Sequence, residues 1–203
     1  MGKSARLVRA VSRLGTKGIV LVTHKLLCRR ADQFRKWRDW YFLATEEIKY
    51  VSDITGWSIT LISDILALTS PRLSIRRNLR VTFHYLITGQ WLPGVLQAVK
   101  DSVAKYEMTG HINGEKTSAF AEALRGNGDA IVMDTWTFRL MGLPDKPLAK
   151  DRRAAKNTIQ RASVKMGWKP AAFQASLWCW MLNSRGRNLV YYPVLRVFRE
   201  FVA

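Results

Sequence analysis

Apolar residues along most of this chain recur at intervals of three or four, the spacing that places them on one face of an α-helix. Ile59, Ile62 and Leu66 follow this pattern, and so do other segments of the chain. Helices are predicted at 57–68, 71–87, 117–125 and around 155–166, with others beginning at Pro93, Asp134 and Pro170 and a last amphipathic one within 190–203. Ala130–Met133 is the only candidate strand, and it is short. The predicted fold class is all-α, with about eight to ten helices.

Turn-forming residues interrupt the pattern at several places. Gly56 breaks it, and Ser70-Pro71 is a typical helix start, with Ser70 as the N-cap and Pro71 at the first helical position. Gly142 stands where a C-terminal cap is expected. The chain is predicted to divide into a basic helical region (1–55), a main domain (56–190) and a C-terminal tail or helix (191–203).

The chain carries a large excess of positive charge. Its 203 residues include 33 Lys and Arg against 15 Asp and Glu, a formal net charge of +18. This indicates a polyanionic partner, nucleic acid first and an anionic membrane surface second, while a basic protein without such a partner is the alternative. The stretch between Pro71 and Tyr85 has no acidic residue and contains Arg72, Arg76, Arg77 and Arg80. These arginines are expected either to contact phosphates or to form a solvated helix face.

Residues 1–31 contain no acid and are rich in arginine, serine and small residues. This composition is typical of an organelle transit peptide and equally of a basic arm that contacts phosphate, and we favour the arm. Basic residues mix with aromatic ones over 25–42, which suits nucleic acid, although a helix with its aromatics in the core explains most of them. No apolar run reaches the roughly 18–20 residues that span a bilayer, so no integral membrane protein is expected.

Metal-ligating residues are scarce in the sequence. There are two cysteines and three histidines, without the spacing of a ligand set. Cys179 stands between two tryptophans, an apolar setting that favours a buried free thiol. We therefore predict neither a metal site nor a cofactor.

The stretch 110–139 holds the most useful chemistry. A glycine-containing turn leads directly to Lys116, and a short apolar run leads to Asp134. Backbone N–H groups at such a turn bind phosphate, which places Lys116 near a DNA backbone. Removing a base from a deoxynucleotide needs an attacking group, such as a deprotonated lysine, and a carboxylate that stabilises the sugar cation. The alternative is ordinary capping, with Asp134 as an N-cap contributing about 1 kcal/mol and Lys116 as an exposed lysine.

Two motifs stand out: Gly114-Glu-Lys116-Thr117-Ser-Ala119, and Ile131-Val-Met-Asp134-Thr135-Trp136 followed by Arg139. Their Lys116 and Asp134 lie 18 positions apart. With the hairpin before them, they resemble the core of the helix–hairpin–helix DNA glycosylase superfamily, which includes endonuclease III and 8-oxoguanine DNA glycosylase. The specific part of the resemblance covers 109–142, and a weaker one covers 57–187. It implies a two-lobed helical bundle with a helix–hairpin–helix motif, in which a base flipped out of double-stranded DNA is held between the lobes.

The resemblance also assigns roles to single residues. Lys116 is the Schiff-base nucleophile and Asp134 the catalytic carboxylate, which implies a DNA glycosylase with AP-lyase activity. Arg72, in Leu68-Thr-Ser70-Pro-Arg72, fills the gap left by the extruded base. The remaining residues expected to contact DNA are Arg76, Arg77, Arg80, Asn113, Gly114, Thr117 and Arg139.

Two positions depart from the family pattern. Ile112 stands where the hairpin has its first glycine, and Trp136 stands where a histidine follows Asp-Thr. Both favour the alternative of a non-catalytic helical DNA-binding protein that retains the fold. In either case the expected protein is a monomer on double-stranded DNA, in the cytoplasm of a bacterium or a phage-infected cell, with organelle targeting by residues 1–31 left open.

Overall fold

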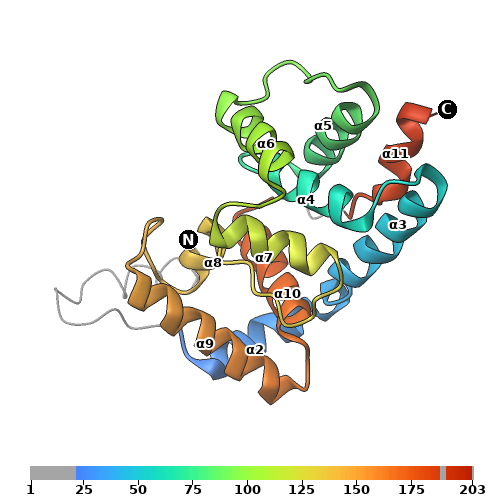
Figure 1. Ribbon diagram of the computed structural model, residues 1–203. Coiled ribbons are helices and arrows are strands. Elements are labelled where there is room, and N and C mark those ends of the chain that lie inside the picture. Colours follow the sequence, from blue (N-terminus) through green and yellow to red (C-terminus); the bar gives the residue numbers. More distant parts are fainter. Residues whose placement is uncertain (1–21, 188–190, 203) are drawn as a thin grey trace.

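The computed structural model describes residues 22–187 and 191–202, and these residues contain helices and no β-strand (Figure 1). A short 3-10 turn, η1 (Arg35–Trp37), accompanies the α-helices. The helices are α2 (His24–Gln33), α3 (Trp40–Thr55), α4 (Ile59–Thr69), α5 (Ile75–Thr88), α6 (Gln97–Thr109), α7 (Glu115–Leu124), α8 (Thr135–Leu140), α9 (Ala149–Met166), α10 (Pro170–Asn183) and α11 (Val194–Val202). The predicted all-α class and the predicted number of helices are confirmed. Most of the predicted basic arm, residues 1–21, lies outside the described residues.

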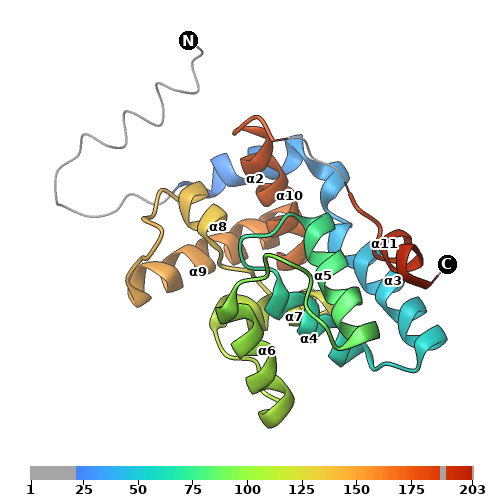
Figure 2. The same ribbon diagram turned by 90° about the horizontal axis from the view of Figure 1, so that it is seen from above.

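One group of helices, α2, α8, α9 and α10, packs around a common core in the lower part of Figure 1 and is called the lower lobe. Leu27 of α2, Ile159 of α9 and Phe173 of α10 have no exposed surface there. The views in Figures 1 and 2 both place α2 beside α9. The N-terminal part of the described chain is therefore built into a core formed mainly by its C-terminal half.

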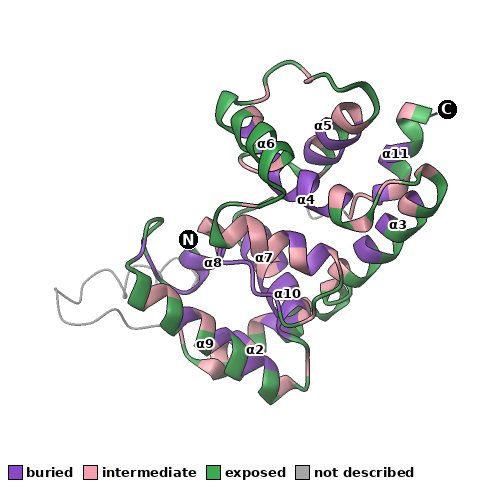
Figure 3. Ribbon diagram, in the orientation of Figure 1, coloured by how far each residue is buried: buried purple, intermediate pink, exposed green. Residues whose placement is uncertain are grey.

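The other helices, α3 to α7 and α11, form the upper lobe around a second core. Its centre is α4, which packs against α3, α5, α6 and α7 and is buried along most of its length (Figure 3). The ring of Phe198 in α11 lies 5.2 Å from that of Phe83 in α5, so the last helix closes this core. Segments 1–55 and 191–203, predicted as separate regions, thus contribute α2, α3 and α11 to the two cores.

The predicted strand candidate joins the lobes instead of forming a sheet. Residues 130–133 are buried and without assigned secondary structure. Ile131 and Met133 pack into the lower core, whereas Ala130 and Val132 pack against Ala123 of α7. This alternation is that of an extended backbone, whose successive side chains point to opposite sides. The segment therefore delivers Asp134 to the boundary between the lobes.

Helices α5 and α6 begin four residues later than predicted, and α9 begins earlier than predicted, at Ala149. Ser70 caps the C-terminal end of α4, and α5 is capped instead by Ser74, whose hydroxyl accepts a hydrogen bond from the Arg77 amide. Residues 71–72 form a turn between the two helices, so α5 begins only after Ser74. Likewise α6 begins at Gln97 and not at Pro93, because Pro93-Gly94 forms a turn.

Other boundaries agree with the sequence. Helix α10 begins at Pro170, and Asp134 is the N-cap of α8. Gly142 follows the end of α8 with a φ of +76°, a conformation that glycine adopts readily. These starts and stops carry local signals in their own side chains, so the sequence predicts them without knowledge of the packing.

Candidate functional site

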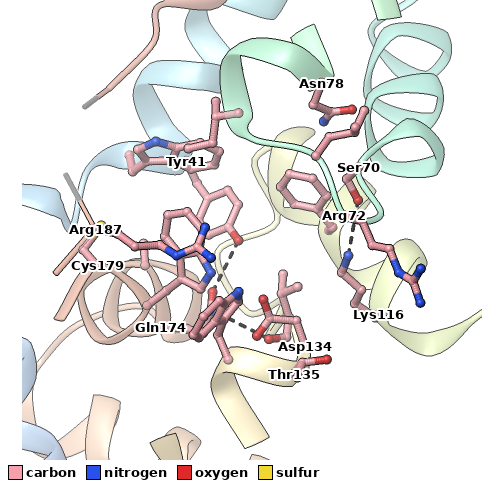
Figure 4. A pocket seen from close by; sticks show the side chains of 18 residues that line it. Tyr41, Ser70, Arg72, Asn78, Lys116, Asp134, Thr135, Gln174, Cys179 and Arg187 are labelled. Carbon is pink, nitrogen blue, oxygen red and sulfur yellow. Dashed lines mark hydrogen bonds between the residues drawn. The ribbon is translucent and has the colours of Figure 1, made fainter. Parts of the chain in front are cut away.

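A cleft of about 420 Å³ lies between the lobes, and side chains from both line it (Figure 4). The upper lobe contributes Lys116 of α7 and Arg72 of the α4–α5 turn. The lower lobe contributes Asp134 and Gln174. The two residues predicted as catalytic therefore share one cleft, which has the size of an ordinary small-molecule or nucleotide pocket.

Lys116 is the second residue of α7 and is partly buried in the cleft wall. The preceding turn ends at Gly114, whose φ of +101° is available to glycine but strained for other residues. The Lys116 ammonium donates a hydrogen bond to the Ser70 hydroxyl over 3.3 Å. Burial lowers the pKa of Lys116, and the negative charge of Asp134 acts in the opposite direction. Burial therefore makes a neutral, nucleophilic amine more accessible than it is on an exposed lysine.

Asp134 both caps a helix and faces the cleft. One carboxylate oxygen, Oδ1, accepts a hydrogen bond of 2.7 Å from the Thr137 amide at the start of α8. The same side chain lines the cleft together with Lys116. The capping interpretation of Asp134 is therefore confirmed, and it leaves the carboxylate at the cleft wall, because a cap fixes the orientation of the side chain without burying it.

A buried glutamine supports the cleft from below. Gln174 of α10 is 2% exposed, and its amide donates to the Val132 carbonyl and the Thr137 hydroxyl over 3.4 and 3.3 Å. Its carbonyl oxygen accepts from the Tyr41 hydroxyl over 3.3 Å. Burial, and next the charge of Asp134, raise the pKa of Tyr41, so this phenol stays protonated and remains a donor. The network connects both lobes to the segment that carries Asp134.

Aromatic side chains form much of the remaining cleft wall. Trp40 and Tyr41 of α3 meet edge to face, with ring centroids 4.9 Å apart, and Phe120 of α7 lies beside both. Trp136 and Trp178 also line the cleft. Such walls suit a flat heterocyclic ligand, because aromatic rings stack well on one another. Trp40 and Tyr41 belong to the basic and aromatic stretch 25–42 that suits nucleic acid, whereas nothing in the sequence separates Phe120 and Trp178 from the aromatics of the core.

Cys179 also lines the cleft and is 2% exposed. It is a free thiol, as predicted, and burial raises its pKa to about 12. A thiol with so high a pKa stays protonated at neutral pH and is a poor nucleophile. Among the residues that the structure describes, no three His, Cys, Asp or Glu side chains are grouped so as to hold a metal ion.

Arg72 has an unusual backbone. Its φ of +61° is the only positive value among the non-glycine residues in the described part of the chain. A residue with a Cβ pays roughly 1–2 kcal/mol for this left-handed conformation. The side chain is exposed at the edge of the cleft (Figure 4). Strain of this kind concentrates at functional sites, which makes Arg72 the most informative of the four predicted arginines.

The other three arginines of the predicted stripe lie outside the cleft lining. Arg76 and Arg80 approach Glu200 of α11, at 3.5 and 3.9 Å. Arg77 donates to the Pro93 carbonyl. The acid that the stripe lacks in its own segment is thus supplied by the last helix, and both ion pairs are exposed enough to exchange with other partners.

The hairpin 110–114 contains the first departure from the family pattern. Ile112 is partly buried and packs against Ile65 of α4 and Val103 of α6. It therefore anchors the hairpin to the upper lobe, which accounts for an apolar residue at this position. Asn113 and Gly114 are exposed beside it, and Thr117 is partly exposed on the first turn of α7.

Arg139, also predicted to contact DNA, is engaged elsewhere. Its guanidinium binds Asp145 through two hydrogen bonds of 2.8 and 2.6 Å, and this bond is the main cause that raises the pKa of Arg139. Arg187, which the sequence did not single out, lines the cleft instead.

Together, fold and site define an all-α protein in which a lysine and a carboxylate from two lobes share one cleft. The chain belongs to a family of unknown function, DUF7178, whose match covers residues 21–185. This range includes both Lys116 and Asp134. No curated protein and no solved structure matches the chain. Within the described residues, none of the helices combines the length and the apolar character needed to cross a membrane.

Proposed function

We propose that this protein is a DNA glycosylase with AP-lyase activity that removes a damaged or modified base from double-stranded DNA. The observation that carries the proposal is the shared cleft of Lys116 and Asp134, in which burial lowers the pKa of the lysine. The net charge of +18 supports a nucleic-acid substrate. We further propose that it works in the cytoplasm of a bacterial or phage-infected cell, with organelle targeting by residues 1–31 as the alternative.

In this mechanism the target nucleotide leaves the duplex and its base enters the cleft, where the aromatic walls stack on it. Arg72 fills the space that the base leaves in the helix. The neutral amine of Lys116 attacks C1′ of the sugar, the bond from C1′ to the base breaks, and the base departs with the electron pair and accepts a proton. Asp134 stabilises the positive charge that develops on the sugar.

The lyase step follows on the same lysine. The ring-opened sugar forms an imine with the Lys116 nitrogen, and loss of a proton from C2′ expels the 3′ phosphate by β-elimination. Water then hydrolyses the imine and restores the free amine. Asp134 is the carboxylate in position to shuttle these protons, since it lines the cleft with the lysine.

A borohydride trap tests this proposal. Borohydride reduces the imine to a stable amine, so wild-type protein mixed with an abasic-site duplex is expected to give a covalent protein–DNA adduct. Lys116→Ala should give none, whereas Lys105→Ala, at an exposed lysine on α6, should react like the wild type. An adduct that persists in Lys116→Ala removes the lysine from the mechanism.

A second candidate is a non-catalytic protein that binds duplex DNA. It is favoured by the contacts that already occupy both groups, since Asp134 caps α8 and Lys116 donates to Ser70. This candidate predicts salt-sensitive duplex binding that survives Asp134→Asn, and no adduct on abasic or damaged-base duplexes. Salt-dependent binding and the trap, measured on the same duplexes, separate the two candidates.

A further inference from the structure

Two arginines lie against the indole of Trp136, and they differ in what else they touch. The guanidinium carbons of Arg139 and Arg187 are each 5.2 Å from the ring centroid. Arg139 is bound through two hydrogen bonds to Asp145, whereas Arg187 lines the cleft. Trp136 therefore contacts both Arg139, which is bound to a carboxylate, and Arg187, which faces the cleft.

The charged groups of the cleft are unbalanced. Its lining contains three cations, Arg72, Lys116 and Arg187, and a single carboxylate, Asp134. Within the described residues, no carboxylate lies within ion-pair distance of the Arg187 guanidinium. A cleft with excess positive charge attracts an anion, and a guanidinium without a carboxylate partner is well suited to bind a phosphate group.

The position of Arg187 complements that of Arg72. Figure 4 shows Arg187 on the opposite side of the cleft from Arg72 and Lys116. A nucleotide that leaves the duplex brings its backbone phosphates with it, so both sides of such a cleft come close to phosphodiester groups. Arg187 is the cation that the lower lobe provides for this purpose.

We propose that Arg187, held in place by Trp136, binds a backbone phosphate next to the extruded nucleotide. This inference rests on the proposed function for its substrate. Trp136 is a positioning residue, because stacking on a rigid indole restricts the arginine and lowers the entropy lost when phosphate binds. Trp136, which replaces the histidine of the DNA glycosylase pattern, thereby has a role in binding.

The test uses duplexes with a tetrahydrofuran abasic analogue, which binds without forming an imine. Arg187→Ala is expected to raise the Kd roughly tenfold and to lower the slope of log K against log salt by about one. The matched control is Arg185→Ala, an exposed arginine of the same turn outside the cleft lining, for which less than a twofold change is expected. Trp136→Phe retains an aromatic surface and should fall between wild type and Arg187→Ala.

A neutral methylphosphonate at the 5′ or 3′ phosphate of the analogue identifies the contact. At one of these positions it should weaken wild-type binding about as much as Arg187→Ala does, and should have no further effect in that variant. Equal losses in Arg187→Ala and Arg185→Ala, or undiminished methylphosphonate effects in Arg187→Ala, overturn the phosphate site.

The outcomes also distinguish this site from the catalytic proposal. Arg187-dependent binding without a borohydride adduct leaves the phosphate site standing and rejects the lyase. A borohydride adduct together with binding that does not depend on Arg187 supports the lyase and rejects the phosphate site. A wild-type protein that binds the analogue duplex no better than a fully paired one rejects the site as proposed, since no nucleotide would then be held in the cleft.

Discussion

Lys116 in the first turn of α7 and Asp134, the N-cap of α8, are 18 positions apart in sequence, and both line one cleft. The two groups are electrostatically coupled. Burial lowers the pKa of Lys116, and the carboxylate of Asp134 raises it. The carboxylate therefore does two opposing things in the proposed reaction, because it stabilises the sugar cation but also favours the protonated, unreactive form of the lysine.

This coupling predicts how the reaction depends on pH. The neutral amine is the nucleophile, so the rate of adduct formation should rise with pH through the pKa of Lys116, with a midpoint below the ordinary value of 10.5. Asp134→Asn removes the charge that raises this pKa, and its midpoint should move to lower pH while its maximal rate falls. Single-turnover trapping rates across pH measure both. A midpoint that moves upward in Asp134→Asn contradicts the coupling.

Asp134 also allows its structural and chemical roles to be separated. Asn is as good an N-cap as Asp, so Asp134→Asn should change the free energy of unfolding by less than about 0.5 kcal/mol, whereas Asp134→Ala should lose about 1 kcal/mol. Both variants lack the carboxylate and should lose base excision to the same extent. Urea unfolding and excision assays on both variants check this. Activity that follows stability instead of charge leaves Asp134 as a cap only.

Local signals in the sequence predicted the helices and part of the site. The Asp134-Thr135 pair predicted the cap of α8, and Pro170 predicted the start of α10. The spacing of apolar residues predicted most of the buried helix faces. These features depend on residues within one or two turns of helix, and this is the range over which sequence patterns are informative. The prediction of Ser70 as the N-cap of α5 was wrong, because Ser74 is an equally suitable capping residue and is the one that caps this helix.

The rest of the site depends on contacts between distant segments. Tyr41 and Gln174 meet across 133 positions, and Arg76 approaches Glu200 across 124. Nothing near Arg187 in the sequence shows that its side chain reaches Trp136 or the cleft. The sequence does not predict the roles of such residues, because these roles depend on the packing of the two lobes and not on neighbours in the chain.

The backbone of Arg72 predicts a trade between stability and binding. Arg72→Gly relieves the left-handed strain and should stabilise the fold by roughly 0.5–1 kcal/mol, after the entropy that glycine adds to the unfolded chain. The same change removes the guanidinium and should weaken binding to an abasic-analogue duplex. Arg72→Ala is the matched control, since it retains a Cβ and the strain but loses the guanidinium: binding should fall equally, without the gain in stability. Thermal unfolding together with duplex titration measures both effects.

The ion pair between Arg125 and Asp64 joins the end of α7 to α4, and so holds the helix that carries Lys116. The Asp64 side chain is 6% exposed and that of Arg125 29%. Burial, and next the interaction with Asp64, raise the pKa of the Tyr106 hydroxyl to about 12.

Removing one partner of a buried pair leaves the other charge without compensation, so Asp64→Ala should lower the free energy of unfolding by about 3 kcal/mol. Asp32→Ala breaks the exposed ion pair between Asp32 and Arg35, whose side chains are 55% and 61% exposed, respectively. This variant should lose less than about 1 kcal/mol of unfolding free energy. Urea denaturation of both variants gives the comparison. Similar costs at the two sites would mean that water reaches the Asp64 pair, and that the apolar contacts between α4 and α7 alone fix the position of Lys116.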